Sequence, residues 1–208
     1  TVKCFEALLR WRHPSKGVIS PALFIPIAED TGLIDAIGDW VISAACDDAA
    51  KWPSDINVAV NVSPNQLQSG SIVESIKNAL DHSKLAASRI ELEITERVFL
   101  HNSEANLLVL QKLRSMGVRI VMDDFGTGFS SLRNLMSFPF DKMKLDRSFV
   151  TNIASDTKIL GIARAALSIS KALNISIVAE GVETRDQAEC LHAMGFDYLQ
   201  GFLFSAPL

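Results

Sequence analysis

The chain has 208 residues, of which 48% are hydrophobic, and a formal net charge of −4. This length and composition suit one globular domain with a large core, so we expect residues 1–208 to form a single domain. An acidic chain without a broad basic region excludes duplex nucleic acid that is held by charge alone. It leaves open a small anionic ligand that is held through a metal ion.

The cysteines and the hydropathy of the chain indicate the cellular compartment in which it is expected. The three cysteines, Cys4, Cys46 and Cys190, form neither a disulfide framework nor a CxxC pair, so we expect buried free thiols in a reducing cytoplasm. No segment reaches the roughly 18 unbroken apolar residues of a membrane span, and no signal peptide is visible. We therefore expect a cytoplasmic domain, whose parent protein is free to be anchored in a membrane elsewhere. The abrupt, strand-like start suggests a piece of a longer protein.

The predicted elements alternate along the whole chain, with short apolar runs followed by amphipathic helical stretches. Turn signals such as Trp52-Pro53 and Met194-Gly195 separate them. Strands are expected near residues 2–9, 57–62, 89–95, 118–123, 142–146, 175–180 and 197–200. Helices are expected near residues 21–31, 36–51, 70–82, 102–116, 156–173 and 184–194.

This alternation predicts an α/β protein with a parallel sheet, because its strands are almost continuously apolar. An open doubly wound sheet and a closed barrel both fit the number of units. Polar residues follow nearly every strand, and only in a closed barrel do the carboxyl ends of all strands converge on one mouth. We therefore expect a TIM-type (β/α)8 barrel, in which one strand of the usual eight is missing from the predicted set.

The ends of the strands carry the chemistry. A buried strand loses stability when it ends in a charged residue, unless something pairs that charge, so repeated polar ends indicate one shared site. The candidate metal ligands offer only oxygen atoms, which select hard cations such as Mg²⁺ or Mn²⁺ rather than zinc or copper. These ligands are Glu6, Asn61, Glu93, Asp123, Asp124 and Glu180. The four histidines (His13, His82, His101 and His192) lie in predicted loops or helices, and we interpret them as surface residues.

Asp123 and Asp124 are adjacent, and neighbouring side chains of a strand point to opposite faces. Both can reach one site only if the strand has just ended and the backbone turns, and residues 125–128 (Phe-Gly-Thr-Gly) would supply that turn. Two carboxylates so close repel each other unless a cation lies between them. One could bridge two metal ions about 3.5–4 Å apart, a recurring arrangement for phosphodiester cleavage. Lys144 could then orient or deprotonate the attacking water, or offset phosphate charge.

Simpler interpretations exist for single residues. Glu96, Glu183 and Asp146 are each as compatible with a structural role as with catalysis, and Asn61 before Ser63-Pro64-Asn65 is compatible with a turn. Residues 10–13 (Arg-Trp-Arg-His) are compatible with a solvated edge. The Asp-Phe-Gly at 124–126 also occurs in kinases, but the glycine loop and the His-Arg-Asp run of kinases are missing. The collective pattern, rather than any single residue, supports a shared site.

A series of ordered motifs from residue 5 to the C-terminus resembles the EAL-type cyclic-di-GMP phosphodiesterase domain. Phe129 and Phe202 stand where that family usually has Tyr, and we expect both changes to be tolerated. Family members also begin with an earlier strand and continue into a final helix, so the resemblance implies that this chain lacks both. The matching motifs are Glu6-Ala7-Leu8 with Leu9-Arg10-Trp11, Asn61-Val62-Ser63, Glu93-Ile94-Thr95-Glu96, DDFGTGFSS from Asp123 to Ser131, Lys144-Leu145-Asp146, Glu180-Gly181-Val182-Glu183 and Gln200-Gly201-Phe202.

The resemblance implies a modified TIM-type barrel that hydrolyses cyclic di-GMP to linear 5'-pGpG with two Mg²⁺ or Mn²⁺ ions. It implies a first metal held by Glu6, Asn61, Glu93 and Asp123, and a second held by Asp123, Asp124 and Glu180. Catalysis would involve Lys144 at the nucleophilic water, Glu180 as a proton acceptor, and Asp124. Substrate contacts would come from Leu8, Arg10, Asp146 and Gln200, while Glu96 and Glu183 would support the loop 124–131 and the dimer contact.

The resemblance also implies partners and an alternative. Family members form homodimers and are commonly fused to sensory, receiver or cyclase domains. The alternative is a receptor that binds cyclic di-GMP without cleaving it. Such receptors have usually lost a metal ligand or the lysine, and this chain retains all of them, so hydrolysis is the favoured prediction. A scaffold that binds neither metal nor nucleotide would leave the carboxylates unexplained.

Overall fold

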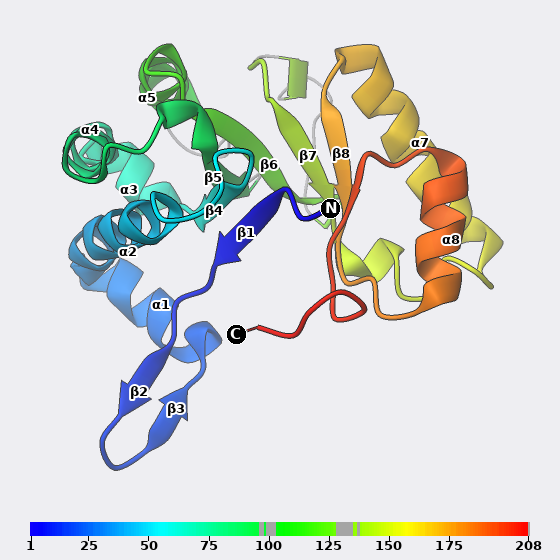
Figure 1. Ribbon diagram of the computed structural model, residues 1–208, viewed down its shortest axis with the longest axis horizontal. Coiled ribbons are helices and arrows are strands. Elements are labelled where there is room, and N and C mark those ends of the chain that lie inside the picture. The colour runs from blue at the N-terminus through cyan, green and yellow to red at the C-terminus, as the bar shows by residue number, and fades with distance from the viewer. Residues whose placement is uncertain (96–97, 99–102, 128–134, 137, 208) are drawn as a thin grey trace. The chain divides into compact units, whose positions relative to one another are not determined.

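The computed structural model describes residues 1–95, 98, 103–127, 135–136 and 138–207 (Figure 1). They form two compact units. The first unit comprises Thr1–Ile94 and Val98–Ile120, and the second comprises Thr95–Arg97 and Val121–Leu208. Within the described ranges, no helix is both long and apolar enough to cross a membrane.

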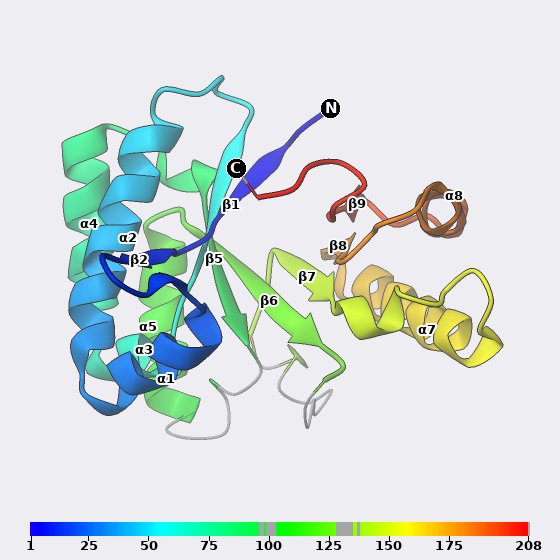
Figure 2. The same cartoon turned by 90° about the horizontal axis from the view of Figure 1, so that it is seen from below.

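The first unit contains three parallel strands, with β4 (Asn57–Asn61) paired to β1 (Cys4–Ala7) on one side and to β5 (Ile90–Thr95) on the other. The alternation along β5 separates buried apolar residues on one face from Glu91 and Glu93 on the other. The helices of this unit gather beside these strands, and α2 packs on β4 (Figure 2). They are α1 (Pro21–Asp30), α2 (Leu33–Ala49), α3 (Pro64–Ser69), α4 (Ile72–Ser83), α5 (Ser103–Ser115) and the short 3-10 helix η1 (Ala87–Arg89).

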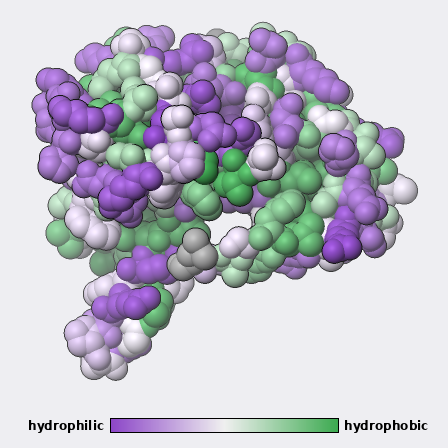
Figure 3. Space-filling view, viewed as in Figure 1, coloured by the Kyte–Doolittle hydropathy of each residue, from purple (hydrophilic) through white to green (hydrophobic). Residues whose placement is uncertain are grey.

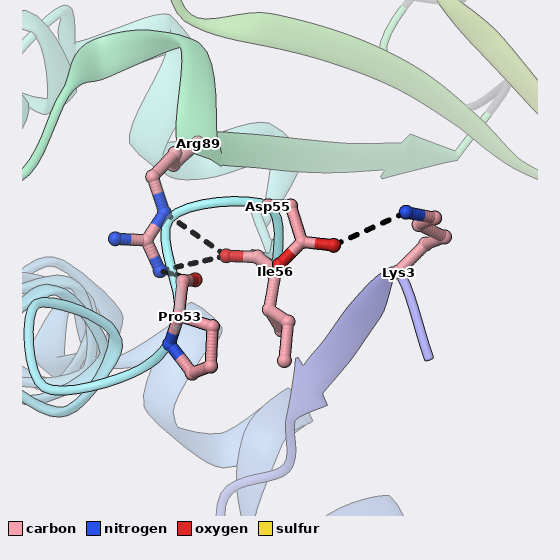
Figure 4. A network of polar contacts seen from close by, with 5 residues as sticks. All are labelled: Lys3, Pro53, Asp55, Ile56 and Arg89. Carbon is pink, nitrogen blue, oxygen red and sulfur yellow. Dashed lines mark hydrogen bonds and ion pairs between the residues drawn. The ribbon is translucent and has the colours of Figure 1, made fainter. Parts of the chain in front are cut away.

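A guanidinium group holds the connection from α2 to β4 in place (Figure 4). Arg89 donates hydrogen bonds to the carbonyl oxygens of Ala49 (2.8 Å), Pro53 (3.1 Å) and Ile56 (2.7 Å). Lys3 and Asp55 form an exposed ion pair of 3.2 Å beside it. Arg89 thereby bonds the carbonyl of the last residue of α2 and two carbonyls of the loop that follows, which ties the start of β4 to the end of that helix.

The second unit continues the same pattern with β6 (Arg119–Phe125, from Val121 onward), β7 (Lys142–Leu145), β8 (Ser176–Ala179) and β9 (Tyr198–Leu199). The strands pair in that order and all pairs are parallel. Helix α7 (Thr157–Leu173) packs on β7 and β8, α8 (Arg185–Met194) connects β8 to β9, and the 3-10 helix η3 (Arg147–Phe149) follows β7 (Figure 1). The predicted βα repeat is confirmed in both units.

All seven predicted strand ranges contain a strand, and all six predicted helix ranges contain a helix. A hairpin and helix α3 are among the described elements that were not predicted. Residues 11–13 and 17–19 form the antiparallel hairpin of β2 (Trp11–His13) and β3 (Gly17–Ile19), whose surface mixes hydrophilic and hydrophobic residues (Figure 3). Helix α3 begins where the sequence suggested only a turn, because Ser63 and Gln66 form a capping box and Pro64 occupies the first helical position.

The cysteines and histidines mostly match the predictions. All three cysteines are free, but only Cys46 is buried, while Cys4 and Cys190 are half-buried. Burial, with a smaller contribution from Asp47, raises the pKa of the Cys46 thiol to about 11.

His82 and His192 are exposed on helices as expected, and His101 lies outside the described residues. His13 contradicts the prediction, since it ends β2, where its Nδ1 accepts a hydrogen bond from the Ser15 N–H at 3.2 Å.

Candidate metal centre

A bulge near the end of β6 directs Asp123 and Asp124 toward one site. β6 pairs with β7 at Met122–Met143 and next at Phe125–Leu145, so β6 contains one extra residue over this stretch. Asp124 adopts a φ of +53°, in the left-handed region that is uncommon for residues other than glycine. The expected change of direction therefore exists, but it begins earlier than predicted, at Asp124 within the strand. A turn also follows the strand, since the Thr127 N–H donates to the Asp124 carbonyl at 3.2 Å.

Asp123, Asp124 and Glu180 form a compact acidic cluster. Each offers one carboxylate oxygen, and these three atoms lie within 4.8 Å of one another. Asp123 is buried, with 8% of its surface exposed, whereas Asp124 and Glu180 are half-buried. Three carboxylates at this spacing repel one another unless positive charge lies among them. Their oxygen-only chemistry fits a hard divalent cation.

Lys144 supplies part of that positive charge. Its side chain is only 2% exposed, and its Nζ lies 2.7 Å from Glu180 Oε1 and 3.3 Å from Asp123 Oδ1. A buried ammonium group is costly without such partners, so the carboxylates stabilise the charged lysine. One ammonium beside three carboxylates still leaves an excess of negative charge when all are ionised. The cluster therefore retains the capacity to attract a cation.

In the first unit, Glu6, Asn61 and Glu93 share one face of the parallel strands. Asn61 is the register partner of Glu93, and Glu6 is the register partner of Ala59, two residues before Asn61. The Asn61 side-chain amide donates a 2.7 Å hydrogen bond to Glu6 Oε1. Glu93 is 4% exposed, Glu6 is half-buried and Asn61 is exposed. The regular pairing of β1, β4 and β5 thus aligns these oxygen-bearing side chains near the carboxyl ends of the strands.

The residues predicted to contact substrate have varied surroundings. Leu8 is 43% exposed, and the exposed Arg10 donates from Nη1 to the carbonyl of Leu9 at 2.9 Å. Gln200 is half-buried, and its backbone bonds to Ala179 (2.9 Å) and Val182 (3.0 Å) hold it directly after β9. Each of the three therefore lies beyond the end of a strand, in the segment that follows it.

Asp146, also predicted to contact substrate, has a local structural contact. It caps η3, since its carboxylate accepts hydrogen bonds from the Ser148 N–H (2.9 Å) and from the Ser148 hydroxyl.

Glu96 and Glu183 were predicted to support the loop 124–131 and a dimer contact. Glu183 is exposed, and its backbone N–H donates to Gln187 Oε1 at 2.8 Å. Glu96 and Phe129 lie outside the described residues. Sequence analysis missed Gln187, a buried residue that bonds to two segments, although a Thr-x-x-Gln capping box at 184–187 was visible in the sequence.

Solved structures of known proteins match this structure and support the predicted α/β fold. The structure matches that of the PaMucR phosphodiesterase in its c-di-GMP complex, with a TM-score of 0.92 and 44% identity over 98% of this chain and 84% of that chain. It matches the cAMP and cyclic-di-GMP bound form of the EAL enzyme Bd1971 with a TM-score of 0.93 and 34% identity, over 99% and 58% of the two chains. The protein is therefore a TIM-like α/β protein, as predicted, with an acidic cluster that could bind a metal.

The family follows from the sequence matches. The model of the EAL domain matches residues 1–207, and the chain belongs to this family. It is 44% identical, over 98% of its length, to the bifunctional diguanylate cyclase/cyclic di-GMP phosphodiesterase MucR of Pseudomonas aeruginosa, and covers 30% of that protein. It is 39% identical, over 100% of its length, to the cyclic di-GMP phosphodiesterase PdeR of Escherichia coli, and covers 32% of it. The chain thus spans about a third or less of these curated relatives.

Proposed function

We propose that this chain hydrolyses cyclic di-GMP to the linear dinucleotide 5'-pGpG with the help of divalent cations. The observation that carries the proposal is the cluster of three carboxylates within 4.8 Å of one another, together with a buried lysine 2.7 Å from one of them. The relatives support the choice of substrate, since MucR and PdeR are described as cyclic di-GMP phosphodiesterases and the PaMucR structure is a c-di-GMP complex.

The proposed cations are two Mg²⁺ or Mn²⁺ ions. Asp123, Asp124 and Glu180 are proposed ligands because their carboxylates converge. Further proposed ligands are Glu6, Asn61 and Glu93, because regular strand pairing aligns their oxygen atoms. Such ions, when bound, make a water molecule more acidic and stabilise charge on phosphoryl oxygens.

The residues beside the cations would handle the water and its proton. Lys144 is held between two carboxylates, so in this proposal it remains an ammonium that orients the attacking water and offsets phosphate charge. Glu180 would accept the proton that the water loses, because its carboxylate lies within hydrogen-bonding distance of the same ammonium. Asp124 would hold the cation at the position that the bulge in β6 gives it.

Substrate contacts and assembly complete the proposal. The Arg10 guanidinium has the donors to form a bidentate pair of hydrogen bonds with a phosphate group of the dinucleotide. Leu8, Gln200 and Asp146 would line its binding site, while Glu96 and Glu183 would support the loop 124–131 at a homodimer contact. We further propose a cytoplasmic location, and fusion of this single domain to a sensory, receiver or cyclase domain.

The test is chromatographic. The purified protein would be incubated with cyclic di-GMP and Mg²⁺ or Mn²⁺. Metal-dependent appearance of 5'-pGpG, abolished by a chelator, is the expected result. Binding of cyclic di-GMP by folded protein without any product would contradict hydrolysis and would favour the alternative of a receptor.

A further inference from the structure

The second unit contains a short segment, residues 146–151, that lies between the loop after β6 and the loop after β8, next to the residues of the acidic cluster. It consists of Asp146, the 3-10 helix η3 and the two residues that follow it. The Asp146 carboxylate caps η3, and the Thr151 N–H and hydroxyl both bond to the Arg147 carbonyl, at 3.0 and 2.9 Å. These bonds connect the residues of the segment to one another. We call residues 146–151 the η3 segment.

On one side the η3 segment contacts the loop after β6. A Cβ built on Gly126 would lie 2.7 Å from Cε2 of the half-buried Phe149, so only glycine allows this approach. Gly126 also has a φ of +97°, which residues with side chains rarely adopt. It lies two residues after Asp124, the ligand candidate with the unusual backbone conformation. The Phe149 ring therefore supports the backbone directly after the bulge.

On the other side the η3 segment contacts the loop after β8. A Cβ on Gly181, whose φ is +67°, would lie 2.5 Å from Arg147 Cβ. Gly181 directly follows Glu180, the third member of the acidic cluster. Gln187 adds a polar connection, because its Nε2 donates to the Thr151 carbonyl at 2.9 Å. Its Oε1 accepts from the backbone N–H groups of Glu183 (2.8 Å) and Thr184 (2.9 Å).

We propose that the η3 segment is a positioning element, which sets the separation of Asp124 and Glu180 by contacting the backbone next to each of them. Phe149 and Gln187 are its positioning residues, and neither belongs to the acidic cluster itself. Groups that hold metal ligands in place commonly affect metal affinity or activity about 10–100-fold when they are replaced. The inference rests on the proposed metal-binding function of the cluster.

Two substitutions loosen one side each. Phe149→Leu removes the ring that supports Gly126. Gln187→Glu keeps the acceptor for Glu183 and Thr184, so the capping box survives, but a carboxylate cannot donate to the Thr151 carbonyl. Phe196→Leu is the matched control, because Phe196 is buried in the same unit but lies before β9, at the opposite end of the strands.

The measurement is Mn²⁺ affinity, obtained from the electron paramagnetic resonance signal of free Mn²⁺, together with the melting temperature without metal. We expect Phe149→Leu and Gln187→Glu to raise the Mn²⁺ dissociation constant about tenfold, while Phe196→Leu lowers the melting temperature and leaves the dissociation constant unchanged. Unchanged Mn²⁺ affinity in both test variants would overturn the proposal.

The same measurement separates this proposal from hydrolysis. A wild-type protein that binds Mn²⁺ without cleaving cyclic di-GMP would contradict the proposed function, while the three affinities would still decide the role of the η3 segment. A folded wild-type protein that binds no Mn²⁺ would overturn the positioning proposal.

Discussion

The two units place acidic side chains at the carboxyl ends of parallel strands in different ways. In the first unit ordinary register is sufficient, since Asn61 and Glu93 are direct partners and Asn61 bonds to Glu6. In the second unit the backbone departs from regular geometry, with a bulge in β6 and a left-handed Asp124. Regular pairing can align residues on neighbouring strands, but it cannot place two adjacent residues of one strand on the same face. The Asp123-Asp124 pair therefore requires the bulge.

The largest expected effect follows from removing the lysine of the second unit. Lys144→Ala should lower the rate of 5'-pGpG formation by about two to three orders of magnitude, the usual contribution of a positioned donor that stabilises developing charge. Chromatography of the product measures this rate, and circular dichroism checks that the fold survives. A variant with full activity would contradict the role of Lys144.

Asp124→Asn tests the bulge position directly. The amide keeps the shape of the side chain but removes the negative charge of a proposed metal ligand, so turnover should fall by orders of magnitude because the cation that activates the water is held less tightly. Titration with Mn²⁺ should show weaker binding in the same variant. If turnover and Mn²⁺ affinity both stay at the wild-type level, Asp124 does not hold the cation.

Glu91 and Glu93 sharpen the comparison within the first unit, because they lie on the same face of one strand. Glu91 is 1% exposed, accepts a 2.7 Å hydrogen bond from Asn57 Nδ2, and lies 3.8 Å from Arg119 Nη1. Glu91→Ala should lower the free energy of unfolding by about 1–3 kcal/mol, because the half-buried Asn57 amide loses its partner. Glu93→Ala should weaken Mn²⁺ binding instead.

Denaturant unfolding and metal titration of both variants separate the two roles. A Glu91→Ala variant that loses only Mn²⁺ affinity would reverse this assignment. So would a Glu93→Ala variant that loses only stability.

Arg89 tests whether the connection from α2 to β4 is structural alone. Arg89→Ala removes every donor to the carbonyls of Ala49, Pro53 and Ile56, so the free energy of unfolding should fall by about 1–3 kcal/mol. Turnover at a temperature where the variant is folded should stay at the wild-type level. A loss of turnover without a loss of stability would show that the start of β4 bears directly on catalysis.

The smallest effect concerns Cys46, which is 1% exposed and whose pKa is raised to about 11. At pH 8 its thiol should stay protonated and unreactive, because the thiolate is the nucleophile. A chromogenic thiol reagent should therefore label Cys46 only after unfolding, as peptide mass spectrometry would reveal. Rapid labelling of Cys46 in the native protein would contradict its burial.

The sequence predicted the strands and helices well because the spacing of apolar residues within each segment indicates its secondary structure without knowledge of the rest of the chain. It also predicted that the carboxylates would lie together, since a charged residue at the end of a buried strand costs stability unless it is paired, and this occurs on several strands. The bulge in β6 escaped prediction, because a register shift depends on the pairing with β7, which lies far along the chain. No sequence pattern indicated that Asp146 caps η3 or that Phe149 approaches Gly126. These contacts depend on how three loops pack.

The most direct test of the central claim is to locate the cation. Crystals grown with Mn²⁺ would be measured at the manganese absorption edge, where anomalous scattering identifies the ion. The bulge and the acidic cluster predict an anomalous peak at bonding distance from Asp123, Asp124 and Glu180, with Lys144 beside it. A protein that binds Mn²⁺ in solution but shows its anomalous peak elsewhere, with Asp124 turned away, would contradict the proposed metal centre.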